Sequence, residues 1–121
     1  MYGDHGYGIA SLSDDSTVVT GDFYESAAFG KGEAIETVLI STDGNRDVFV
    51  ARYNWDGTIE WAKRAGGSNY DSGYGITALS DDSSVVTGYF DISAIFGPGE
   101  SGETELISAG SWEIFVARYK P

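Results

Sequence analysis

Short apolar segments alternate with polar, glycine-rich segments along the whole chain. The apolar segments are rich in Val, Ile, Phe, Tyr and Thr, and clusters of Gly, Asp, Asn and Ser bound them, which is the pattern of β-strands and turns. In the first half of the chain the predicted strands span residues 7–12, 18–23, 48–53 and 59–64. No stretch has a sustained period of 3.6 residues, so the pattern indicates an all-β fold.

Two of the connections have the composition of hairpin turns. Residues 13–17 join the first pair of strands, and residues 54–58 join the second pair through Asp56-Gly57. Glycine supplies the positive φ that a tight hairpin turn requires. A longer, glycine-rich connection separates the two hairpins, and residues 37–41 within it are a candidate for a short extra strand.

The second half of the chain repeats the first. At an offset of 67, 26 of the 38 positions from Asp4 to Ser41 are identical. After one deleted residue the offset becomes 66, and Phe49–Tyr53 returns as Phe115–Tyr119. We therefore expect two copies of one four-stranded antiparallel unit.

The second copy is shorter than the first. The first unit spans residues 1–67 and the second residues 68–121. The predicted strands of the second unit span residues 74–79, 85–90 and 114–119. Nothing in it matches the strand at 59–64, so we expect it to lack its outer strand.

A tandem repeat of four-stranded antiparallel sheets is the sequence form of β-propeller blades. Each blade of a propeller is covered on both faces by its neighbours. Two blades alone leave two faces uncovered, and repeat units share a core only when about three or more are stacked. We therefore expect copies of the chain to complete a ring, with four chains favoured over three, and we expect a homo-oligomer rather than a monomer.

Several linked motifs resemble those of a known family. Val-Val-Thr-Gly-x-Phe occurs at residues 18–23 and 85–90, Asp-Val-Phe-Val-Ala-Arg-Tyr at 47–53, and Asp-Gly-Thr-Ile-Glu-Trp-Ala-Lys-Arg-Ala-Gly-Gly at 56–67. In this order they resemble the bacterial β-propeller repeat found in tandem copies in large secreted or surface proteins. The resemblance implies a propeller whose inner strands line a channel, a secreted or cell-surface location, and no catalytic residues.

Charge and composition narrow the range of partners. Seven Lys and Arg against 19 Asp and Glu give a net charge of −12, and the pI is near 4.1. Such a surface repels phosphate backbones and anionic lipids, so we expect neither nucleic acid nor a membrane as a partner. The 121 residues contain no cysteine, no transmembrane span and no signal-peptide pattern, and we expect a soluble domain.

Paired carboxylates in two predicted turns raise the question of a metal site. Asp14-Asp15 and Asp81-Asp82 are each flanked by serines. Oxygen-rich loops bind Ca²⁺, but a calcium site needs about six oxygen ligands, and neither loop supplies them. Asp and Ser are also favoured in turns because they hydrogen-bond to their own backbone. We therefore expect no metal and no cofactor.

His5 is the only histidine, and it is thus the only candidate base for a Ser-His-Asp triad. Its counterpart in the second copy is Ser72, so no catalytic role is repeated, and we expect a solvated loop histidine near the terminus. The sequence has no signature of a nucleophile, metal or cofactor. We expect a protein that is not an enzyme, and catalysis is the third hypothesis.

Aromatic residues are the remaining candidates for a binding surface. Trp55 lies in the second hairpin turn, Trp112 follows Gly110-Ser111 in a predicted loop and aligns with Asn45, and Tyr7 and Tyr74 begin the inner strands. Exposed aromatic rings stack on sugars, and they equally cover a neighbouring blade or an oligomer contact. The expected function is that of a structural or interaction scaffold, with a lectin-like, glycan-binding propeller as the alternative.

Overall fold

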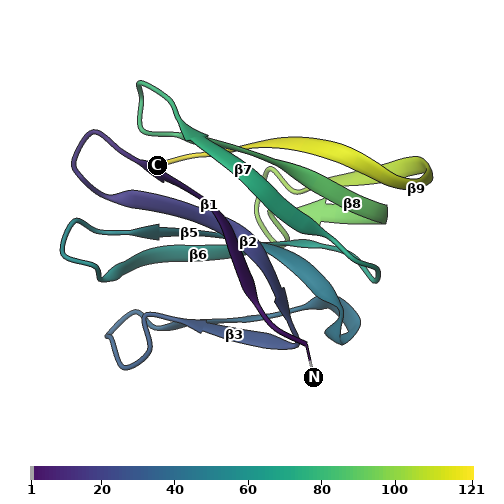
Figure 1. The fold of residues 1–121 in the computed structure, drawn as a ribbon, viewed down its shortest axis with the longest axis horizontal. Helices are drawn as coiled ribbons and strands as arrows, with labels where there is room; N and C mark the ends of the chain where they lie inside the picture. Colours follow the sequence, from purple (N-terminus) through teal and green to yellow (C-terminus); the bar gives the residue numbers. More distant parts are fainter. Residues whose placement is uncertain (1) are drawn as a thin grey trace.

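The computed structural model describes residues 2–121 as an all-β protein, which confirms the predicted class (Figure 1). The strands in this part of the chain are β1 (His5–Ser11), β2 (Thr17–Tyr24), β3 (Ser26–Phe29), β4 (Thr37–Ile40), β5 (Arg46–Tyr53), β6 (Ile59–Gly66), β7 (Ser72–Ala78), β8 (Ser84–Phe96) and β9 (Thr104–Tyr119). One short 3-10 turn, η1 (Thr42–Gly44), precedes β5. Within residues 2–121 no helix is long and apolar enough to cross a membrane.

Seven strands form one antiparallel sheet. Its order is β1-β2-β5-β6-β8-β7, and β9 pairs with β8. The sheet curls into a half-barrel, since β1 and β7, the two ends of this order, lie side by side (Figure 1). The rings of Tyr7 and Tyr74, one from each strand, have centroids 4.6 Å apart. The curl therefore brings the two repeats face to face.

The long connection between the second and third predicted strands differs in structure between the two repeats. In the first repeat, β3 and β4 form a separate two-stranded sheet, and η1 separates β4 from β5. Segment 37–41 thus pairs with β3, and it does not fill the open edge of the second repeat. In the second repeat the same hairpin continues directly from β8 and β9, which makes these strands longer than expected. Glu25, between β2 and β3, and its counterpart Ile92, within β8, both have positive φ. The backbone therefore changes direction at the same position in both repeats.

The main apolar core lies between the repeats. Its fully or nearly fully buried members are Val48, Val50, Ala65, Val86, Phe90, Ala94, Phe115 and Tyr119. The Trp61 ring on β6 stacks on Tyr119 of β9, with centroids 6.2 Å apart. A second cluster, formed by Phe23, Phe49, Ala51 and Ile59, lies under the β3–β4 hairpin. The face of the first repeat that contacts the second repeat is therefore buried, and the β3–β4 hairpin covers part of the opposite face.

Two buried carboxylates lie where the repeats join. Asp71 accepts the backbone N–H of Gly67 at 2.8 Å and that of Asp91 at 3.2 Å. Asp47 accepts the backbone N–H of Thr42 at 2.9 Å and pairs with Arg64 at 3.1 Å. Burial raises the pKa of Asp71 to about 7 and the pKa of Asp47 to about 6, because it disfavours the charged form more than these hydrogen bonds favour it.

Candidate functional site

A row of aromatic side chains crosses the molecule from β1 over β7 and β8 to β9. We call Tyr7, Tyr74, Tyr89 and Trp112 the aromatic row. Successive ring centroids are 4.6, 5.6 and 4.5 Å apart. Tyr7, Tyr74 and Trp112 are about half exposed, so the row presents ring surface to solvent.

The curl of the sheet assembles this row. Tyr7 and Tyr74 are counterparts in the two repeats, and they meet because β1 lies beside β7. Tyr89 and Trp112 have no aromatic counterparts, since the first repeat has Asp22 and Arg46 at these positions. An ion pair in the first repeat, with Arg46 Nε 3.7 Å from Asp22 Oδ2, is thus replaced by a pair of rings in the second.

Polar groups underlie the aromatic row. The fully buried Asp22 lies 2.9 Å from His5 Nδ1, and its other oxygen accepts the Ser72 hydroxyl at 2.6 Å. Arg46 donates to the Tyr89 hydroxyl at 2.9 Å. Arg46 thus links Tyr89 of the row to the buried Asp22, and Ser72 joins this carboxylate to the second repeat.

This Ser, Asp and His set does not have the geometry of a catalytic triad. In a triad the histidine lies between the carboxylate and the serine and takes the serine proton. Here Asp22 lies in the middle, because both Ser72 Oγ and His5 Nδ1 bond to its carboxylate. His5 is exposed, as expected, but the expected loop position was wrong, since His5 is the first residue of β1 and contacts the buried Asp22.

The structure brings three of the four predicted aromatic residues together and places the fourth elsewhere. Trp55 is 77% exposed in the β5–β6 turn. That turn follows Tyr53, which pairs with Thr17 at the start of β2, whereas Tyr7 lies opposite the middle of this strand, between the pairs Gly6–Gly21 and Gly8–Thr20. Trp112 lies within β9, opposite Asp91, so the expected loop position was wrong.

The paired-carboxylate turns are hydrogen-bonded within the protein. Asp14 accepts from the backbone N–H and hydroxyl of Ser16, and Asp81 accepts in the same way from Ser83. The side-chain and backbone hydrogen bonds from these serines lower the pKa of both carboxyl groups. Within residues 2–121 no group of three or more His, Cys, Asp or Glu side chains is placed to hold a metal ion.

The second repeat also presents an uncovered apolar face. On β9, Ile114 is 80% exposed and Val116 is 68% exposed. Their counterparts in the first repeat, Val48 and Val50, are fully buried against the second repeat. The same backbone position is thus core in one repeat and surface in the other.

No protein-family model matches the chain, and no curated protein is significantly similar to it. The resemblance to the bacterial propeller repeat therefore stays a prediction.

Proposed function

We propose that this protein is a non-catalytic repeat module that assembles with copies of itself into a closed β-propeller ring of three or four chains. The exposure of Ile114 and Val116, whose counterparts are core residues, carries the proposal. The second repeat covers the counterpart positions on the first repeat, Val48 and Val50. A neighbouring chain would cover Ile114 and Val116 in the second repeat, and burying a side chain of this size is worth about 1.5–3 kcal/mol.

A complementary surface lies on the first repeat. Ile76 of the second repeat packs on the core between the repeats, whereas its counterpart Ile9 is exposed. The face of one chain's first repeat would thus meet the face of the next chain's second repeat. Such a head-to-tail interface closes into a ring when the rotation per chain divides a full turn.

An Ile114→Asp substitution tests this assembly. A charge at the centre of an apolar interface is costly, and the residue is exposed in the single chain, so the fold is expected to survive. Light scattering should give the mass of one chain for Ile114→Asp, and an unchanged oligomer for the matched control Trp55→Asp in the distant turn. An Ile114→Asp protein that keeps the wild-type oligomer mass would contradict the proposed interface.

The aromatic row supports a second candidate, a lectin-like function. Tyr7, Tyr74 and Trp112 offer half-exposed ring faces, and such faces stack on sugars. The test is a glycan array with the wild type, Trp112→Ala and the control Trp55→Ala. This function predicts binding that is lost only with Trp112→Ala. Absence of glycan binding, or binding unaffected by Trp112→Ala, would exclude the row as a sugar platform.

A further inference from the structure

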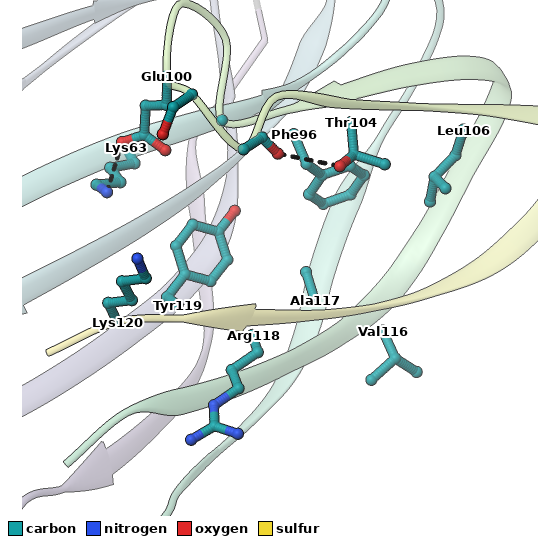
Figure 2. Close-up of a pocket in the computed structure, with 13 residues that line it drawn as sticks. Lys63, Phe96, Glu100, Thr104, Leu106, Val116, Ala117, Arg118, Tyr119 and Lys120 are labelled. Atoms are coloured by element: carbon teal, nitrogen blue, oxygen red, sulfur yellow. Dashed lines mark hydrogen bonds and ion pairs between the residues drawn. The ribbon is translucent and has the colours of Figure 1, made fainter. Parts of the chain in front are cut away.

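A cavity of about 680 Å³ lies beside β9, next to the turn that joins β8 to β9 (Figure 2). Phe96, Leu106, Ala117 and Tyr119 form apolar parts of its wall. Glu100 from the turn lies above Tyr119 in Figure 2 and pairs with Lys63 of β6 at 2.6 Å. The cavity thus has an apolar wall and a carboxylate at one side.

The same site in the first repeat is filled. The counterparts of the four wall residues are Phe29, Leu39, Ala51 and Tyr53. All four belong to or pack on the second core cluster, where Ile59, the first residue of β6, is 1% exposed. The occupant of this site in the first repeat is therefore the beginning of β6.

Backbone contacts complete that site. Glu33 accepts the backbone N–H of Ile59 at 2.8 Å. A Cβ at Gly30 would lie only 2.2 Å from Ile59 Cγ2, so the turn that joins β3 to β4 packs closely against the first residue of β6. The second repeat has the same two residues as Glu100 and Gly97, but a Cβ at Gly97 would meet only Glu100.

The second repeat also leaves the strand edge open. In the first repeat, β6 pairs with β5 from Val48 to Tyr53. The counterpart segment of β9, residues 114–119, pairs with β8 alone within the described part of the chain. The Tyr119 hydroxyl is buried there without a hydrogen-bond partner among residues 2–121, and it points toward the turn that carries Glu100 (Figure 2). An unpaired edge beside an apolar cavity is the arrangement that binds an added strand.

We propose that β9 and this cavity form a strand-acceptor site for an extended peptide segment with the sequence pattern of β6. In β6 the isoleucine lies opposite Tyr53, the tryptophan opposite Arg52 and an alanine opposite Ala51. In the acceptor, the isoleucine of the bound segment lies opposite Tyr119, its tryptophan opposite Arg118 and its alanine opposite Ala117. Glu100 receives the N–H of the isoleucine.

The occupant is a free strand of a partner polypeptide rather than the face of a folded second copy. β6 of a folded copy is already paired with its own β5, so it is not free to donate this edge. The segment also carries Lys63 and Arg64 against the single acid Glu60, which favours its approach to a chain of net charge −12. The acceptor lies within one chain and does not depend on the proposed ring.

The probe is a fluorescein-labelled synthetic peptide with the sequence of residues 58–66, titrated with the full chain and followed by fluorescence anisotropy. We expect saturable binding of one peptide per chain, and at least about tenfold weaker binding of a peptide carrying Ile59→Asp. Hydrogen exchange should slow at the amides of residues 114–119. No saturable binding, equal binding of the Ile59→Asp peptide, or protection only at other strands would overturn the proposal.

Variants of the chain test the same site from the acceptor side. Glu100→Gln should weaken peptide binding about tenfold, because a hydrogen bond to a charged acceptor is replaced by one to a neutral acceptor. The matched control Glu105→Gln, on β9 outside the cavity, should bind like the wild type. Ile9→Asp, at the exposed position on β1, should also bind normally, which separates this site from the assembly interface. Equal weakening in Glu100→Gln and Glu105→Gln would contradict the assigned role of Glu100.

Discussion

Gly73 of β7 lies so close to Thr20 of β2 that a Cβ on Gly73 would be 2.2 Å from Thr20 Oγ1. This contact joins the two repeats, because Gly73 belongs to the second and Thr20 to the first. A Cβ on its counterpart Gly6 would have no neighbouring atom within 4 Å. The two glycines thus occupy one repeat position in two environments, one packed and one open.

Gly73→Ala should destabilise the single chain by about 1–3 kcal/mol, because the added methyl group overpacks the junction. Gly6→Ala should change the unfolding free energy of the single chain little, since its methyl group meets no neighbour. Urea unfolding in the Ile114→Asp background, where we expect single chains, measures both. Equal costs for the two substitutions would show that the junction does not rely on this close approach.

The β5–β6 turn depends on Gly57, which has a φ of +88°. Gly57→Ala should lower the unfolding free energy by about 1–2 kcal/mol, and the strain is in the backbone, because no atom lies within 4 Å of its Cβ position. Gly102→Ala is the matched control, since Gly102 is equally open and does not have positive φ. Thermal unfolding that responds equally to both would argue against a strained turn.

Stability should fall as the pH rises from about 4 to about 7. Burial raises the pKa of Asp71 to about 7 and of Asp47 to about 6 from the model-peptide value of 3.8, so the folded chain holds protons that the unfolded chain has lost. Their contribution is fully present below about pH 4 and is lost as the pH passes the folded pKa values. Urea unfolding at several pH values measures this slope, which Asp71→Asn should reduce.

The carboxyl groups in the turns act in the opposite direction and in another range. Hydrogen bonds from Ser16 and Ser83 lower the pKa of Asp14 and Asp81, so the stability they add is lost only as the pH falls below about 4. Unfolding free energies measured between about pH 4.5 and 7.5 therefore report on Asp71 and Asp47 rather than on the carboxyl groups in the turns. Unfolding free energy that rises with pH across this range would contradict the assignment.

Trp61 should contribute to the junction, and Trp55 should not. Trp61 stacks on Tyr119 and packs on the core between the repeats, so Trp61→Ala should cost about 2–3 kcal/mol. Trp55 is exposed in a turn, and Trp55→Ala should change stability by less than about 0.5 kcal/mol. Both values come from urea unfolding, and a larger cost for Trp55→Ala would reverse this reading of the core.

The sequence predicts local structure better than the joining of the two repeats. Alternating apolar residues and the Asp56-Gly57 turn are local signals, and the strands and hairpin they indicate are present as β5 and β6. The curl that places β1 beside β7 depends on glycines such as Gly8, which the backbone carbonyl of Tyr74 approaches, and Gly73, which the Thr20 side chain approaches. Such an approach has no local signature, so its partners could not be read from the sequence.

The aromatic row shows the same limit at the candidate site. Tyr7, Tyr74 and Trp112 were candidates as exposed rings, but Tyr89 was missed, although it links Tyr74 to Trp112. The sequence did contain a signal for Tyr89, because the two repeats differ at this position and Tyr89 stands where the first repeat has Asp22. A one-residue deletion also concealed the register of Trp112, which aligned with a loop residue in the sequence but lies in β9.

Self-assembly is the central claim, and the mass of the wild-type protein in solution tests it most directly. Light scattering over a range of micromolar concentrations should give one species of three or four chains of 12.9 kDa each. A closed ring has no free interface, so the mass should not increase further with concentration. A single-chain mass at every concentration, with cooperative unfolding retained, would show that the uncovered face of the second repeat is stable in water and would contradict the account.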